Sequence, residues 1–204
     1  MQFSRDRILT THVGSIPRPR AMLDLASYTK GPPKDVEAYA KVVRASIGEV
    51  VKKQAAVGLD VVNDGEYGKE SWANYIIKRV SGFEIRPDQL RPLDWIGGDK
   101  ERFPEYVKHE FPHVEKGAPT EACIGPVRYQ DRRRLDLAVG ALTDALKAVD
   151  VQEGFMTAVA PASTAYNGVN EYYPSETEFV FAIADALREE YRAIHKAGLL
   201  VQVD

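Results

Sequence analysis

Hydrophobic and polar positions along this chain follow two alternating periods. Short runs that are almost wholly apolar predict strands at residues 8–13, 59–63, 121–124, 155–159 and 199–203. Between them, apolar residues recur every three to four positions, which predicts helices at about 21–29, 35–57, 71–79, 131–148 and 175–197. This alternation is typical of βα units in a parallel sheet. Because the strand runs are apolar on both faces, we expect a sheet covered by helices or closed into a barrel.

Two joints between a helix and a strand are nearly the same in sequence. Residues 58–64 and 198–204 each begin with a glycine, continue as a short apolar strand and end in an aspartate. We expect Gly58 and Gly198 to end helices, and Asp35 and Ser175 to cap the two long helices.

The number of predicted strands indicates part of a barrel. A complete (β/α)₈ barrel has eight strands in about 250 residues, whereas five strands are predicted in these 204 residues. Asp204 follows a core strand with nothing to cover its edge. We therefore expect one domain over residues 1–204, the N-terminal part of a TIM (β/α)₈ barrel. Residues 84–118 are too long for a simple connection and are expected to form a lid or inserted binding loop.

Composition narrows the class of protein. The net charge is −3, and 44% hydrophobic with 28% charged residues is ordinary for a soluble domain. No basic excess indicates nucleic-acid binding, and no apolar run approaches the ~20 residues of a membrane span. The N-terminus lacks the apolar core of a signal peptide. Cys123 is the only cysteine, so no internal disulfide can form, which favours the reducing cytoplasm.

The first candidate for chemistry lies where the predicted strand 8–13 breaks at Gly14 and Ser15. In α/β folds, ligands bind at the carboxyl ends of the strands. A Gly-Ser step there offers backbone N–H groups and a hydroxyl. The alternative is a plain strand-to-helix turn in which Gly14 supplies a positive φ and Ser15 caps the helix. His12, just before it, is more often a packed strand residue than a catalyst or a metal ligand.

Carboxylates end two other predicted strands. Asp64 and Glu66 lie two residues apart and face the same way if the strand continues. They could bind an ammonium group, a metal ion or a proton, or they could form a solvated acidic turn. Asp204 at the matching joint favours function. We expect these strand ends and the Gly14–Ser15 turn to converge on one small polar ligand.

The residues after Glu66 are expected to be structural. Trp72, Tyr75 and Arg79 could share one helical face, with the aromatic rings packed in the core. Lys69 and Arg79 are expected to point to solvent. Cys123 is expected to be an inert, small hydrophobic residue. The histidines and the cysteine show no zinc spacing, and neither a phosphate loop nor a Gly-x-Ser-x-Gly elbow is present.

Four segments together resemble a known family. Thr-Thr-His-Val-Gly-Ser-Ile-Pro-Arg-Pro at 10–19, the run 58–66 ending in Asp-Gly-Glu, Ile-Gly-Pro-Val at 124–127 and Val-Gln-Val-Asp at 201–204 resemble the catalytic barrel of cobalamin-independent methionine synthase. The shorter single-barrel relatives are more similar still, and the resemblance extends over essentially the whole chain. It implies a TIM barrel of the methionine synthase and uroporphyrinogen decarboxylase type.

The same resemblance implies a zinc-dependent methyltransferase that methylates a thiol, most simply homocysteine to give methionine. Zinc would hold the homocysteine sulfur as a nucleophilic thiolate. By motif matching, the amino-acid part of homocysteine would contact Val13, Gly14, Ser15, Glu66 and Asp204, with His12 and Asp64 beside them. Glu66 and Asp204 would be the catalytic pair. Donor groups suit a carboxylate and two acids suit an ammonium.

Several points stay open in the sequence. The family's zinc ligands, a His-x-Cys pair, a Glu and a further Cys, follow the fifth strand, so they are expected beyond Asp204 and not in this chain. The methyl donor could be a methyl-folate or another compound. One alternative is a related thiol alkyltransferase of the epoxide:coenzyme M type. Another is a non-catalytic half-barrel completed by a partner chain or by a second copy.

Overall fold

The computed structural model describes residues 1–25, 35–91, 96–111 and 117–204. A parallel sheet lies at its centre, in the order β1-β4-β6. Its strands are β1 (Val61–Asn63), β4 (Glu153–Ala158) and β6 (Leu200–Val203). The strand predicted at residues 8–13 is wrong in extent, because only Thr11 is paired, in a parallel bridge to Val61 on the other side of β1. The predicted α/β class with a parallel sheet is confirmed, whereas closure into a complete barrel stays a prediction.

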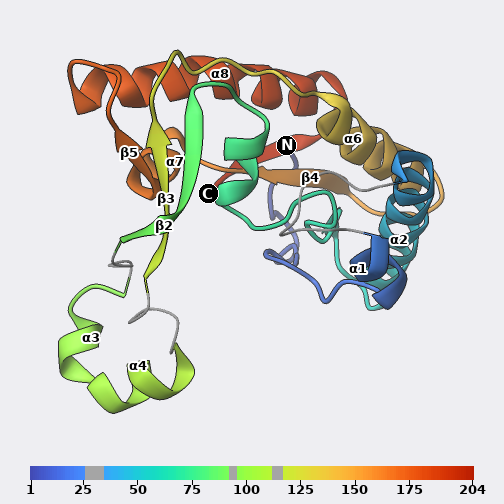
Figure 1. Ribbon diagram of the computed structural model, residues 1–204. Coiled ribbons are helices and arrows are strands. Elements are labelled where there is room, and N and C mark those ends of the chain that lie inside the picture. Colours follow the sequence, from blue (N-terminus) through green and yellow to red (C-terminus); the bar gives the residue numbers. More distant parts are fainter. Residues whose placement is uncertain (26–34, 92–95, 112–116) are drawn as a thin grey trace.

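Three long helices connect these parallel segments. They are α2 (Val36–Ala56), α6 (Arg133–Leu146) and α8 (Glu176–Lys196). The helix α6 contacts both α2 and α8, and Figure 1 shows the three helices following one another around the side of β4. Each helix turns its apolar stripe toward the sheet, where Val43, Leu142 and Ile194 are fully buried. The helices thus leave the carboxyl ends of the strands open for a site.

The expected helix ends are confirmed. The Asp35 side chain accepts a hydrogen bond from the Ala38 N–H, and Ser175 accepts one from the Glu178 N–H. Gly58 and Gly198 have φ values of +85° and +78°, which glycine adopts without strain. The two repeated joints therefore have the same backbone shape and feed β1 and β6 into one sheet.

A second sheet departs from the sequence prediction. It has the order β2-β3-β5 and consists of β2 (Phe83–Arg91), β3 (Ala118–Cys123) and β5 (Gly168–Asn170). The strand predicted at 121–124 belongs to this sheet, so its assignment to the parallel sheet is wrong. Its antiparallel partner β2 carries Pro87 and several charges, and the register shifts between Arg86 and Leu90. Such a strand shows little apolar alternation and was missed.

Residues 84–118 are more regular than expected. The strands β2 and β3 form a long hairpin, and Figure 1 shows α3 (Asp99–Arg102) and α4 (Pro104–Glu110) at its far end, away from the body of the protein. The remaining residues of this segment, 92–95 and 112–116, lie outside the described residues. The role of the segment as a lid stays a prediction.

The short elements differ most from the predicted ranges. The helix predicted at 71–79 is a short 3₁₀ helix, η1 (Asn74–Lys78), and α1 (Arg20–Leu25) covers the described part of the helix predicted at 21–29. The helix α7 (Pro161–Asn167) was not predicted. Among the helices that the structure describes, none combines the length and apolar character that a membrane crossing requires.

Candidate active site

Two turns meet at the carboxyl end of the parallel sheet. The first follows the N-terminal segment and contains Ser15, and the second follows β1 and contains Glu66. The Ser15 hydroxyl donates to Glu66 Oε2 at 2.5 Å, and the Ile16 N–H donates to the Gly65 carbonyl at 3.1 Å. Asn63 joins the same turns, since its amide donates to the His12 carbonyl at 2.5 Å. The expected approach of the Gly14–Ser15 turn to Glu66 is therefore present, whereas convergence of Asp204 on the same ligand stays a prediction.

Local hydrogen bonds shape the second turn. The Asn63 side chain accepts from the Gly65 N–H at 2.8 Å, and the Asp64 side chain accepts from the Glu66 N–H at 3.0 Å. Gly65 and Glu66 both have positive φ values, +64° and +60°. Among the described residues, Glu66 is the only non-glycine with a positive φ. A conformation that costs about 1 to 2 kcal/mol indicates that the position of this side chain matters.

The Glu66 carboxylate is buried and held on both oxygens. Its side chain is only 3% exposed. Oε2 accepts from Ser15, and Oε1 accepts from the Thr157 hydroxyl at 3.2 Å. Thr157 lies on β4, the strand next to β1, so three parallel segments contribute to one carboxylate. Sequence reasoning missed Thr157, although a polar residue near the end of an apolar strand run was a usable signal.

Lys69 was expected in solvent, and this is wrong. Its side chain is 3% exposed, and Nζ donates to the Thr157 hydroxyl at 2.7 Å and to the Thr157 carbonyl. Nζ also lies 4.9 Å from the centre of the Tyr75 ring. The tight turn at Glu66 reverses the chain and directs the Lys69 side chain inward, which residue type alone does not reveal.

Asp64 faces the interior as well. It is 1% exposed, so the alternative of a solvated acidic turn is wrong. Its Oδ1 accepts from the backbone of Glu66, while its buried Oδ2 has no hydrogen-bond partner in the structure. Burial raises the pKa of this carboxyl, and the nearby Lys69 ammonium acts in the opposite direction. Asp64 therefore shapes the turn. The expectation that Asp64 and Glu66 face the same way depended on a continuing strand, and the chain forms a turn at these residues instead.

A second buried carboxylate lies deeper in the protein. Glu190 on α8 is fully buried and accepts from Tyr75 at 2.5 Å and from Tyr129 at 2.7 Å. Arg79 contacts the same carboxylate at 3.3 Å and is 4% exposed, so its expected position in solvent is also wrong. The Arg79 guanidinium lies 4.7 Å from the centre of the Tyr75 ring.

Acidic and basic side chains surround Lys69. The ionisable groups that act on it are Asp64, Glu66, Glu190 and Arg79. Arg18 lies at the same turn, where its guanidinium donates to the backbone carbonyl of Glu66 at 3.2 Å and to that of Lys69 at 2.7 Å. Three acidic side chains therefore lie among three basic ones, Lys69, Arg79 and Arg18.

The other predicted residues of the first turn lie around Ser15. Gly14 has a φ of +97°, as the turn requires. The His12 ring nitrogen Nε2 is 3.2 Å from the Gly14 carbonyl oxygen, and Val13 is 51% exposed. Their position at the end of the N-terminal segment lets them contact a ligand, and their roles stay predictions.

Asp204 reaches the same edge of the sheet from β6. Its backbone N–H donates to the Ala158 carbonyl, and its carbonyl accepts from the Ala160 N–H and from the Ser163 hydroxyl at 3.3 Å. The Gln202 amide donates to Asp204 Oδ1 at 2.8 Å. Asp204 is thus fixed beside α7, two strands away from β1.

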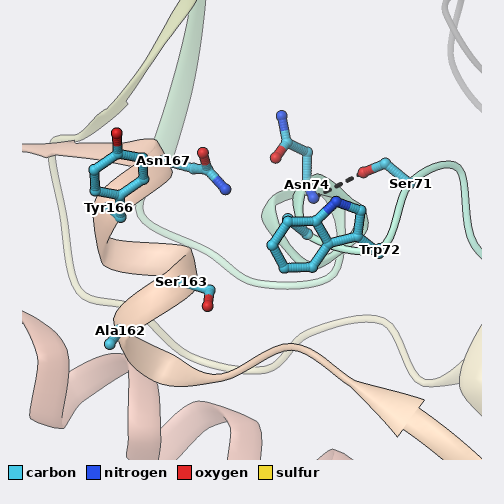
Figure 2. A pocket seen from close by; sticks show the side chains of 8 residues that line it. Ser71, Trp72, Asn74, Ala162, Ser163, Tyr166 and Asn167 are labelled. Atoms are coloured by element: carbon cyan, nitrogen blue, oxygen red, sulfur yellow. Dashed lines mark hydrogen bonds between the residues drawn. The ribbon is translucent and has the colours of Figure 1, made fainter. Parts of the chain in front are cut away.

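A pocket of about 710 Å³ opens beside α7. One wall consists of residues 71–74, which follow the Glu66 turn, and the other consists of residues from α7. Figure 2 shows Trp72 and Tyr166 on these two walls, with Ser163 below them. Trp72 and Tyr166 are 52% and 54% exposed. The expected shared face of Trp72, Tyr75 and Arg79 is therefore wrong, because Trp72 precedes η1 and faces the pocket.

The described residues do not fit a zinc site. No group of three or more His, Cys, Asp or Glu side chains in the described part of the chain could hold a metal ion. Cys123 is buried in β3, where its thiol contacts the Gly125 carbonyl at 3.4 Å and burial raises the thiol pKa. The expected burial of Cys123 in a strand is confirmed, and its inertness stays a prediction.

Comparison with known proteins gives a consistent result. The family model described as the catalytic domain of the cobalamin-independent synthases matches residues 8–91. The methionine synthase of Saccharolobus islandicus (strain L.S.2.15) is 24% identical over 196 residues, which are 96% of this chain and 52% of that protein. The methionine synthase of Pyrococcus furiosus is 22% identical over 96% of this chain and 51% of its own length.

Two solved structures share the fold. A B12-independent methionine synthase from a Shewanella species, in complex with selenomethionine, has a TM-score of 0.66 and 19% identity, covering 96% of this chain and 50% of the other. A putative vitamin-B12-independent methionine synthase from Listeria monocytogenes has a TM-score of 0.63 and 22% identity, covering 95% and 50%. The chain spans about half the length of the relatives it matches.

Proposed function

We propose that this chain, a relative of the cobalamin-independent methionine synthases as its motifs predicted, binds an amino-acid thiol at Glu66 and presents it for methyl transfer. Homocysteine is the thiol that the family resemblance implies. The observation that carries the proposal is the buried Glu66 carboxylate, held on both oxygens by hydroxyl groups at the carboxyl end of the parallel sheet.

The Glu66 carboxylate suits a substrate ammonium. Each carboxylate oxygen can accept about two hydrogen bonds, and the structure uses one on each oxygen. The remaining lone pairs can accept from an ammonium. The donor groups of the turn at Gly14 and Ser15 suit the substrate carboxylate. Asp204 is proposed as the second acid, approaching from β6.

The pocket beside α7 is proposed to hold the methyl donor. Its volume of about 710 Å³ is ordinary for a small-molecule site. The rings of Trp72 and Tyr166 offer flat apolar surfaces, and Asn74, Ser163 and Asn167 offer polar groups at its rim. A methyl-folate has a ring system that fits such walls. In the reaction, the bond from sulfur to the methyl carbon forms as the bond from the donor to that carbon breaks.

The contribution of the described residues is binding and orientation. Holding the two reactants in a fixed geometry converts an encounter in solution into a reaction within one complex, which can lower the barrier by several kcal/mol. Because the described residues do not fit zinc, no step is assigned to a metal here, and zinc stays a prediction from the family resemblance.

The Glu66 carboxylate also separates the two candidate substrate classes. A sulfonate thiol of the coenzyme M type has no ammonium and would add a negative charge beside Glu66. The position of Glu66 therefore favours an amino-acid thiol over the alkyltransferase alternative. A half-barrel completed by a partner chain or a second copy stays a prediction.

A binding experiment with matched ligands tests this proposal. Isothermal titration calorimetry would compare L-homocysteine with 4-sulfanylbutanoate, which lacks only the amine. We expect the unmodified protein to prefer homocysteine and Glu66→Gln to lose roughly 10- to 100-fold of that preference, as for a charge-assisted hydrogen bond. Glu189→Gln, an exposed change on α8, is the control. Equal binding of both ligands by the unmodified protein would contradict the proposal.

A further inference from the structure

Lys69 and Thr157 form a buried chain of hydrogen bonds that ends on Glu66. Lys69 follows Glu66 by three residues in the turn after β1, whereas Thr157 lies on β4. Lys69 Nζ contacts the Thr157 hydroxyl oxygen at 2.7 Å and also its carbonyl oxygen, and the Thr157 hydroxyl lies 3.2 Å from Glu66 Oε1. All three residues are at most 4% exposed, so water does not compete for these contacts.

The direction of each hydrogen bond follows from the groups involved. An ammonium has donors and no acceptor, so the Thr157 hydroxyl must accept from Lys69. The hydroxyl has a single proton, which then points to Glu66 Oε1. Glu66 Oε1 therefore accepts this hydrogen bond. The hydrogen bonds from Thr157 and Ser15 orient the carboxylate and determine which of its lone pairs remain for a ligand.

The groups around Lys69 act on its pKa in opposite directions. Burial is the largest effect and lowers the pKa of Lys69, Asp64, Glu190 and Glu66 oppose this by attraction, and Arg79 acts with burial, so that the pKa lies below its ordinary value. Nζ also lies 4.9 Å from the centre of the Tyr75 ring, a contact that favours a cation.

We propose that Lys69 and Thr157 are positioning residues that hold Glu66 as an oriented acceptor for the ammonium group of an amino-acid substrate. The inference rests on the proposed function and extends it, because it assigns the preference for an amine to residues that do not touch the substrate. The structural alternative is that Lys69 only ties the β1 turn to β4. That role would affect all ligands of the site equally.

The test uses the ratio of affinities for L-homocysteine and 4-sulfanylbutanoate. Thr157→Val removes the hydroxyl at similar volume, and we expect the ratio to fall roughly five- to tenfold. Thr157→Ser keeps a hydroxyl and should restore most of the ratio. In the Glu66→Gln background, Thr157→Val should change the ratio no further, because the two residues act as one unit.

The separate affinities for the two ligands give a second readout. Losing the Thr157 donor should weaken the binding of homocysteine and leave the affinity for 4-sulfanylbutanoate within about twofold of that of the unmodified protein, because only homocysteine carries the amine. If Thr157→Val does not fold by circular dichroism, Thr157→Ala and Lys69→Met replace it with the same expected loss of the ratio.

Each outcome separates the two proposals. A protein with no preference for homocysteine would contradict the proposed function itself. A protein that prefers homocysteine, and whose folded hydroxyl-free variants keep the full ratio, would overturn the positioning role alone. Equal weakening of both ligands would show that Lys69 and Thr157 are only structural.

Discussion

Ser15 and Glu66 lie 51 residues apart in sequence, and a hydrogen bond of 2.5 Å joins their side chains. Each residue stands in a turn at the carboxyl end of a parallel segment, and those segments are neighbours through the Thr11–Val61 bridge. Pairing of the segments therefore brings the hydroxyl to the carboxylate. The contact makes the position of Glu66 depend on the backbone of both turns.

Replacing Gly65 tests that dependence. In Gly65→Ala, a φ of +64° is strained, and the new Cβ would lie 3.3 Å from the Ile16 Cβ. We expect the free energy of unfolding to fall by about 1 to 2 kcal/mol and the affinity for homocysteine to fall with it. Urea denaturation and calorimetry measure the two effects.

Gly48 offers a matched control, because the same substitution is expected to raise the free energy of unfolding instead of lowering it. It lies inside α2, and an added Cβ would meet nothing within 4 Å. Gly48→Ala should raise the free energy of unfolding by about 0.5 to 1 kcal/mol, because alanine is the better helix former. A loss of stability of the same size in both variants would be inconsistent with this account of the turn.

Trp72 provides a test of the pocket. Because its side chain is 52% exposed, we expect Trp72→Ala to change the free energy of unfolding by less than about 1 kcal/mol. It removes one wall of the pocket, so binding of 5-methyltetrahydrofolate should weaken about tenfold. Phe181→Ala, at a 68% exposed position on α8, should leave binding unchanged. Unchanged binding in Trp72→Ala would place the donor elsewhere.

Two adjacent glutamates on α8 allow the contribution of a buried carboxylate to stability to be compared with that of an exposed one. Glu190→Gln leaves Arg79 buried without its ionised partner, and we expect a loss of about 3 kcal/mol in the free energy of unfolding. Glu189 pairs with Arg132 at the surface, so Glu189→Gln should stay within about 0.5 kcal/mol. Chemical denaturation of both variants measures the difference, and similar values would argue against the buried network as a stabilising element.

Local sequence patterns predicted much of the fold. The caps at Asp35 and Ser175, the glycine joints and the three long helices depend on a few neighbouring residues, so they could be identified from sequence. The second sheet could not be identified from sequence. The antiparallel partner of β3 is β2, which is charged and contains a proline, so β2 does not show the alternation of apolar and polar residues that marks a strand. Because its neighbouring strand β2 was not predicted, the strand at 121–124 was assigned to the wrong sheet.

The candidate site shows the same division. Ser15, Glu66 and Asp204 could be proposed because strand ends and motifs are visible in sequence. Thr157 and the burial of Lys69 and Arg79 could not, because they depend on which strands become neighbours and on the reversal of the chain at Glu66. Residue type favoured solvent for both cations, and tertiary structure overrode it.

The pH dependence of stability gives a test at the second sheet. Glu121 on β3 has a buried Oε2 with no hydrogen-bond partner. Burial raises the pKa of this carboxyl from its ordinary value of 4.5 to about 7, against the attraction of Arg91 and Lys78. Between these two values the unfolded chain loses the proton while the folded protein keeps it. The folded state therefore binds more protons, and stability falls as the pH rises through this window.

Replacing Glu121 with an uncharged isostere isolates this contribution. Glu121→Gln has no proton to lose. We therefore expect its free energy of unfolding, relative to that of the unmodified protein, to increase as the pH rises from 5 to 8. This difference should be smallest at pH 5, where the folded carboxyl is already neutral, and should become constant above about pH 7. Urea denaturation of both proteins at several pH values measures it. A difference that does not change with pH would mean that Glu121 titrates alike in the folded and unfolded states, and that its burial in β3 has no energetic effect on ionisation.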